Sequence, residues 1–150
     1  MSDRTGSDDG NETCIDKYAK TPLFVGLIIG VLAAFAVPKF SASVERSKAA
    51  EAFNYLSAIE AAQERFHARQ GTYASNLADL DVQFAQPKYF DVGEVAGDDL
   101  ETGWSLTLTR KGASGGYGLY TVVFTQDGFD TANSTIATDE KCVAINPMQT

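Results

Sequence analysis

An unbroken run of apolar residues at 23–37 constrains this chain more than any other feature. Extended to 21–40, the run reaches 20 residues with Lys39 as its only charge, and about 20 helical residues cross a bilayer. A Lys near a helix end can extend its ammonium group to the membrane interface. In a chain of 150 residues, the rest of the protein is too small to surround a helix that is apolar on all sides. The run therefore predicts a transmembrane helix, or a helix in the core of a filament.

Three interpretations of the apolar run remain open at this point: a cleaved secretory signal, a plain signal anchor, and a helix that continues past the membrane. The small residues Ala34 and Ala36 flank Phe35 as in a signal-peptidase site, and cleavage after Ala36 would release a secreted soluble binding domain. The preceding 1–20 segment is long and net acidic, whereas a secretory signal begins with a short basic region. Because this segment is polar and lacks apolar periodicity, we expect a disordered acidic tail.

The residues after Pro38 favour the third interpretation. Helix formers dominate 41–70, which contains no Gly or Pro, and Gly71 supplies a helix stop. We therefore expect one helix over about 21–70, kinked at Pro38 because proline removes a backbone donor and crowds the preceding turn. Its second half is amphipathic. The apolar stripe consists of Val44, Phe53, Leu56, Ile59 and Phe66, and the charged residues on the other faces are Glu45, Arg46, Lys48, Glu51, Glu60, Glu64 and Arg65.

Small residues recur every four positions in the first half of this helix. Gly26, Gly30 and Ala34, together with Pro38, form a ridge on one face that includes a GxxxG pair. In an apolar helix, such a ridge lets a neighbouring helix approach closely. The ridge is therefore the candidate helix-packing face.

The remainder of the chain has the pattern of a small antiparallel sheet. Large apolar residues alternate with Ser and Thr, or β-branched and aromatic residues cluster, in four short segments. A meander of three or four strands has one apolar face, and the stripe of helix 41–70 is the partner that covers it. The fold class is thus α+β. The candidate strands are 88–92, 104–109, 119–125 and 141–145.

Composition argues against several classes of function. The net charge of −8, without a basic stripe, is unsuited to nucleic-acid binding. His67 is the single histidine, and it lies in a charged helical run where a solvated side chain is expected. With Cys14 and Cys142 as the two cysteines, a His and Cys metal site is hard to assemble. We expect no enzyme activity, no cofactor and no small-molecule substrate.

One acidic segment raises the question of calcium. Asp127 and Asp130, with Asn133 nearby, could supply oxygen ligands, but their spacing does not match an EF-hand loop. Asp and Gly are also typical turn residues, so an ordinary turn is the competing interpretation.

Two segments of the chain resemble a known family. GVLAAFAVPKF at 30–40 is similar to the hydrophobic signature of type IV pilins and type II secretion pseudopilins. RQGTYASNLADL at 69–80 is similar to their post-helix element, a Gly-x-Tyr followed by a Leu-x-x-Leu turn. Further matches, at 103–109, at 120–122 and before Cys142, resemble the pilin sheet and C-terminal region.

The resemblance implies a pilin-like fold, in which a long helix packs on a small antiparallel sheet, and a structural function. The partners it implies are the membrane and other pilin-like subunits, bound through the N-terminal helix. It places the protein in the bacterial inner membrane as a single-pass protein, or in a cell-surface filament, with the N-terminus cytoplasmic and the C-terminal domain outside.

The processing region departs from the family pattern. Asp16 and Lys17 stand where the family has the Gly-Phe or Gly-Met bond that prepilin peptidase cuts, and Thr21 replaces the usual glutamate. In the family, that glutamate neutralises the new N-terminal amine of a neighbouring subunit, a pairing that is useful only when both charges are present. Here neither charge is expected, so we expect the anchor to be retained.

We accordingly expect three parts: the tail at 1–20, the membrane or filament-core helix half at 21–40, and a pilin-like globular domain at 41–150. The domain comprises the amphipathic helix 41–70, and a sheet with loops at 71–150. In the topology of the family, Cys14 and Cys142 lie on opposite sides of the membrane and cannot pair within one chain. Cys142 is then either a small buried thiol or an intermolecular bridge.

Overall fold

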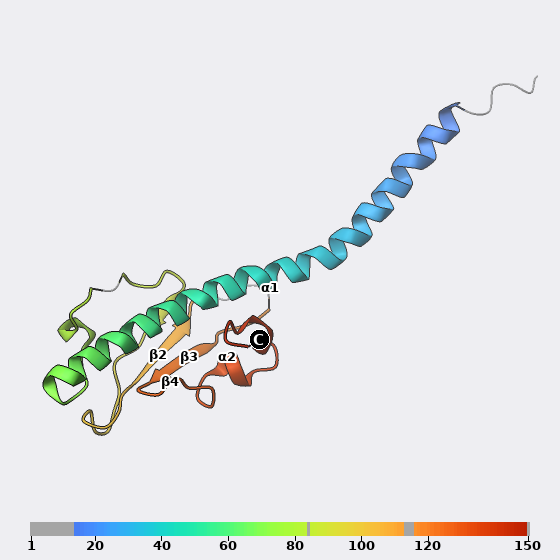
Figure 1. Ribbon diagram of the computed structural model, residues 1–150. Helices are drawn as coiled ribbons and strands as arrows, with labels where there is room; N and C mark the ends of the chain where they lie inside the picture. Colours follow the sequence, from blue (N-terminus) through green and yellow to red (C-terminus); the bar gives the residue numbers. More distant parts are fainter. Residues whose placement is uncertain (1–13, 84, 113–115, 150) are drawn as a thin grey trace, which may run out of the picture. The chain divides into compact units, whose positions relative to one another are not determined.

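The structure is a computed structural model that describes residues 14–83, 85–112 and 116–149. The chain separates into two compact units, Met1–Lys39 and Phe40–Thr150. The helix α1 (Cys14–Gln70) contributes residues to both units, and the second unit also contains the sheet (Figure 1).

Helix α1 has 57 residues and ends where the sequence predicts. Gly71 adopts a φ of +78°, which favours glycine, and its N–H donates to the carbonyl of His67. The start differs from the expectation, because 14–20, which we assigned to the disordered tail, is helical. That segment contains no Gly or Pro, so nothing in it stops the helix from extending toward the N-terminus. The helix passes through Pro38, and the kink expected there stays a prediction.

The sheet is the antiparallel meander that the sequence predicts, in the order β1-β2-β3-β4. Leu108 of β2 lies opposite Val92 of β1 and Val122 of β3, which sets the register of the three longer strands. The α+β fold class is therefore confirmed. The strands are β1 (Phe90–Val92), β2 (Ser105–Arg110), β3 (Thr121–Thr125) and the short β4 (Gly128–Phe129).

The prediction of a strand at 141–145 is wrong. That segment forms tight turns that end in the 3₁₀ helix η2 (Val143–Ile145). Its two buried side chains, Cys142 and Ile145, are three residues apart, which suits a 3₁₀ turn rather than the period of two of a strand. Where β4 ends, the segment around Ser134 pairs with the exposed edge of β3. The hydroxyl of Ser134 accepts the N–H of Val123 and donates to the carbonyl of the same residue. The short helix α2 (Thr135–Thr138) follows directly.

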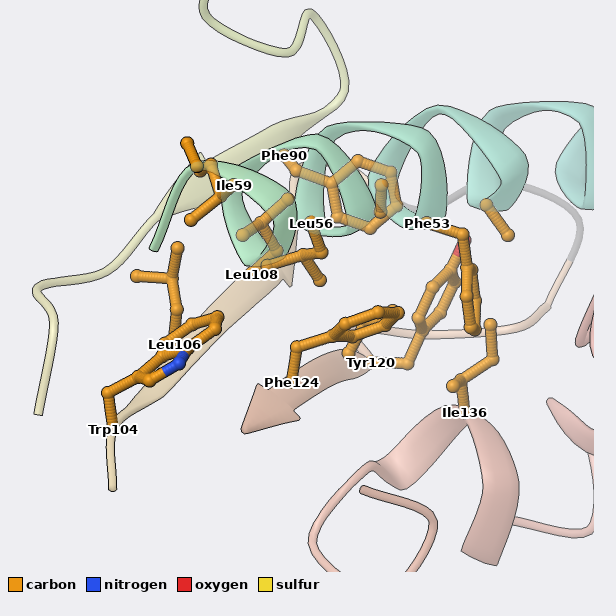
Figure 2. Packing of buried hydrophobic residues seen from close by; sticks show 14 of the residues in the cluster. Phe53, Leu56, Ile59, Phe90, Trp104, Leu106, Leu108, Tyr120, Phe124 and Ile136 are labelled. Atoms are coloured by element: carbon orange, nitrogen blue, oxygen red, sulfur yellow. The ribbon is translucent and has the colours of Figure 1, made fainter. Parts of the chain in front are cut away.

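The core lies between the second half of α1 and one face of the sheet, as Figure 2 shows. Leu56 and Ile59 of α1 are fully buried, and the ring of Phe53 meets that of Phe124 edge-on at 5.8 Å between centroids. Burying one such side chain contributes about 1.5–3 kcal/mol. Two expectations for the helix stripe are corrected: Val44 is exposed, and Glu45, which we expected on a solvated face, is buried.

Candidate functional site

The large apolar side chains in the N-terminal part of α1 are exposed to solvent. They are between 48% and 75% exposed, although exposed apolar patches of this size are rare on soluble monomers. By length and composition, α1 from Pro22 onward is long and apolar enough to cross a membrane. This segment is called the apolar segment below. Its exposed large residues are Leu23, Phe24, Val25, Leu27, Ile28, Ile29, Val31 and Leu32.

The small-residue ridge is open on its outer side. A Cβ atom added at Gly26 or at Gly30 would meet no atom within 4 Å, and Ala34 is exposed. A second helix could therefore approach this face closely, as the sequence predicts for such a ridge. Pro38 continues the same helix, but its side chain lies outside the described residues.

The processing register falls inside α1. Asp16, Lys17 and Thr21 all have helical backbone, so the positions that correspond to the family's cleavage site are not in an extended segment. Their side chains, and the whole of 1–13, lie outside the described residues.

A buried ion pair joins α1 to the sheet in the second unit. The Arg110 guanidinium of β2 donates from Nε to Oε1 of Glu45 at 2.5 Å and from Nη2 to Oε2 at 3.2 Å. The phenol of Tyr120, which immediately precedes β3, donates to the same carboxylate at 3.2 Å. All three side chains are at most 2% exposed. One carboxylate therefore ties the helix to the ends of two strands.

The electrostatics of this cluster follow from its burial and its partners. Burial by itself would raise the pKa of Glu45, but the hydrogen bond and charge of Arg110, with a smaller contribution from Lys48, hold that pKa below its ordinary value. Burial raises the pKa of Tyr120, and the charge of Glu45 raises it further. Nη1 of Arg110 donates to the backbone carbonyls of Tyr89 and Lys111. The lowered pKa keeps Glu45 ionised near neutral pH, and its two carboxylate oxygens accept hydrogen bonds from Arg110, Lys48 and Tyr120.

This cluster is the feature that sequence reasoning missed. The sequence places Glu45 among the charged residues outside the apolar stripe, and the strand expected at 104–109 stops one residue before Arg110. One signal was available, because Arg110 continues the alternation of Leu106 and Leu108 and must therefore face the core. A charge on that face requires a partner from another element.

The calcium candidates form ordinary turns. Oδ1 of Asp130 accepts the N–H groups of Ala132 and Asn133, and its Oδ2 accepts the Asn133 amide at 2.7 Å. These hydrogen bonds lower the pKa of Asp130. Asp127 accepts from the side chain of Gln126 at 2.7 Å. Within the part of the chain that the structure describes, no three His, Cys, Asp or Glu residues are grouped to hold a metal ion.

The thiol and the histidine both lie in structural surroundings. Cys142 is 1% exposed and its thiol donates to the carbonyl of Tyr117 at 3.3 Å; burial raises its pKa, and the charge of Asp139 raises it further. His67, expected to be solvated, is half-buried and stacks on Tyr73 at 4.4 Å between centroids. Its Nε2 lies 3.2 Å from the carbonyl of Glu101.

Comparisons of the chain with protein-family models, with curated proteins and with solved structures found no match. The likeness to pilins therefore depends on the sequence segments at 30–40 and 69–80, and it remains a prediction.

Proposed function

We propose that this chain is a pilin-like or pseudopilin-like structural subunit, or a membrane-anchored accessory protein, of a type IV pilus or type II secretion-type system. The observation that supports this proposal is the division of one helix between two environments. Among the described residues, the large side chains of the apolar segment are exposed, whereas one face of the same helix is buried against the sheet from Glu45 onward. An anchored subunit needs both properties in one element.

The element that follows the helix adds support. In the segment that resembles the pilin post-helix element, Tyr73 and Leu80 are buried in the core, and Leu77 packs against it. Gln63 of α1 holds the turn in place, because its side chain donates to the carbonyl of Ala74 at 3.0 Å and accepts the N–H of the same residue at 2.8 Å. The residues of this segment therefore share a structural role, because they fix the turn that leads from α1 into the sheet domain.

The proposed mechanism is assembly through helix packing in the bilayer or in a filament core. The N-terminus is cytoplasmic and the sheet domain is outside, facing partners. Neighbouring α1 helices approach along the ridge of Gly26, Gly30 and Ala34, where the backbone is bare of bulky side chains.

A pair of variants of the full chain tests this mechanism. Gly30→Leu blocks the ridge, whereas Ile28→Phe enlarges a side chain about 200° around the helix and serves as the matched control. We expect α1 to α1 crosslinking in membranes to fall severalfold for Gly30→Leu and to stay unchanged for Ile28→Phe. Equal crosslinking in both variants would rule out packing through the ridge.

The alternative, a secreted soluble binding domain released after Ala36, is favoured by one observation. The second compact unit begins at Phe40, only a few residues beyond the small triplet. N-terminal sequencing of the mature protein separates the two proposals. A start at Val37 indicates release, an intact Met1 or Ser2 indicates a retained anchor, and a start at Lys17 indicates cleavage at a divergent peptidase site.

A further inference from the structure

The strand β1 leaves one edge of the sheet open. In the order β1-β2-β3-β4, β1 pairs with β2 on one side, and none of the described strands pairs with its other side. The N–H of Gly93 donates to the carbonyl of Thr107 in β2. Because the backbone groups of successive residues in a strand point to opposite sides, the N–H and the carbonyl of Val92 point away from β2. Free edge groups of this kind are a template for an added strand.

A hollow of about 500 Å³ lies along this open edge. The residues that line it are 92–95 on the side of β1 and 75–78 in the turn that follows α1, together with Gln86. Leu77 from the turn and Val92 from the edge also pack against the core, so both side chains are held in place by the fold. The hollow therefore combines a free strand edge with apolar side chains, and it is called the β1 groove below.

The segments that border the β1 groove are acidic. Glu94 lies in the lining, and lysine and arginine are absent from the described residues that line the groove. Asp79 directly follows the residues of the turn. The loop after Val95 closes in on the same turn, because the N–H of Tyr73 donates to the carbonyl of Leu100 at 2.7 Å. Asp98 and Asp99 belong to this loop, and between Tyr89 and Arg110 the sequence contains no lysine or arginine.

The cations near the groove do not cancel this charge. Lys111 pairs with Asp91 at 2.9 Å, so neither of these two residues adds to the balance. Arg65 and Arg69 of α1 both bind Asp81, which leaves one positive charge there. That charge and Lys88 stand against four further carboxylates, so the surroundings of the groove are net negative. The four carboxylates are Asp79, Glu94, Asp98 and Asp99.

This charge discriminates between the candidate occupants. A second copy of the chain would bring the same acidic edge, and like charges on neighbouring strands repel each other. Charged residues on edge strands are a common protection against such self-pairing. A basic segment is instead attracted, and in an extended segment alternate side chains point to the same side. The occupant that fits is an extended segment in which apolar and basic residues alternate.

We propose that the β1 groove binds an extended, cationic segment of a partner protein, which adds a strand to the sheet at Val92. The N–H and the carbonyl of Val92 pair with the backbone of the segment, as in other cases of strand addition. Its apolar side chains enter the hollow beside Leu77, and its basic side chains contact Glu94 and Asp79 at the rim. All these residues belong to the second unit, so the proposal goes beyond the proposed function and does not need α1 to be anchored.

The test uses the full chain in a neutral detergent and a short labelled peptide in which valine and arginine alternate. Fluorescence anisotropy measures its affinity, and amide hydrogen exchange followed by NMR locates the contact. We expect saturable binding and slower exchange of the N–H of Val92. A peptide in which valine and glutamate alternate should bind at least about tenfold more weakly, because its charges oppose those of the groove.

A modified peptide separates strand addition from simple attraction of charges. Methylation of the backbone nitrogens of its valines keeps every side chain and every charge, but it removes the donors that face the carbonyl of Val92. We expect the methylated peptide to bind about tenfold more weakly, which corresponds to the loss of about one hydrogen bond.

Two exposed glutamates supply a variant and its matched control. Glu94→Lys reverses a charge in the lining of the groove, whereas Glu140→Lys makes the same change in net charge in the turns before η2. Because both side chains are exposed, both variants should fold. We expect Glu94→Lys to weaken the binding of the arginine peptide severalfold and Glu140→Lys to leave it unchanged.

Three results would overturn the strand-addition proposal: equal affinity for the methylated peptide, equal effects of the two variants, or binding that leaves the exchange of Val92 unchanged. A dimer of the free chain with a protected Val92 N–H would also contradict it, because a second copy would then occupy the groove. Failure of the proposed function gives a different result. A chain that is washed from membranes yet still binds the peptide at Val92 contradicts the anchor alone.

Discussion

The two halves of α1 carry similar apolar residues and meet opposite surroundings. Leu27 is 62% exposed, whereas Leu56, on the same helix, is 0% exposed. Leu56 is buried because the half of α1 beyond residue 40 packs on the apolar face of the sheet. A helix that is apolar all round must be covered by something other than its own domain, and the bilayer or neighbouring helices are the available partners.

The buried carboxylate at Glu45 provides the largest expected effect on the covered half. Glu45→Ala leaves the charge of the buried Arg110 guanidinium without a carboxylate partner, so the free energy of unfolding of the sheet domain should fall by about 3–5 kcal/mol. Denaturant unfolding of the detergent-solubilised protein measures it. The adjacent, exposed Arg46→Ala is the control and should cost less than about 1 kcal/mol.

If Glu45→Ala does not fold, the double variant Glu45→Met with Arg110→Met decides the question. Replacing both partners with apolar side chains removes the buried charges together, so this variant should be the more stable of the two. A double variant that is no more stable than Glu45→Ala would contradict the assignment of Arg110 as the unpaired charge.

A pair of identical substitutions compares the two halves directly. Leu56→Ala opens a cavity in the core and should lower the free energy of unfolding by about 2–5 kcal/mol. Leu27→Ala removes the same atoms from a side chain that is exposed, so the free energy of unfolding of the sheet domain should not change measurably. Equal losses would show that the apolar segment packs against the sheet domain and is not a separate anchor.

Local features of the fold were predictable from the sequence, whereas contacts between distant residues were not. The end of α1 at Gly71, and the strands around Leu106 and Val122, were predictable because local patterns of glycine and alternation determine them. The pairing of Glu45 with Arg110 was not predicted, because the two residues are 65 positions apart and only the folded sheet brings them together. The two-residue strand β4 is too short for any periodicity, and 141–145 turned out to be turns although its composition resembles a strand.

The pH dependence of stability tests the electrostatics of the covered half. The folded-state pKa of Glu45 is lower than the ordinary value of 4.5, so its ion pair contributes stability above that value. The contribution is lost as the pH falls from about 4.5 through the folded-state pKa, because the unfolded chain then binds a proton that the folded chain excludes. Between about pH 6 and pH 3, the free energy of unfolding should therefore fall less steeply with decreasing pH for Glu45→Gln than for the native chain. The same pH dependence of the free energy of unfolding in both proteins would contradict the lowered pKa of Glu45.

The smallest expected effect concerns the thiol of Cys142. Burial and a raised pKa both keep this thiol unreactive, so maleimide should label it only after denaturation, in a Cys14→Ser background. Non-reducing gels should show no dimer that depends on Cys142. Such a dimer band would instead favour an intermolecular bridge.

The most direct test of the central claim is whether the full-length protein stays in the membrane because of the apolar segment. Membranes that contain the protein are washed with alkaline carbonate, and the N-terminus of the retained protein is then sequenced. We predict that the protein stays with the bilayer, with the apolar segment intact, and leaves it only in detergent. Recovery of the full-length chain as a soluble monomer without detergent would contradict the account, as would a mature chain that begins at Val37.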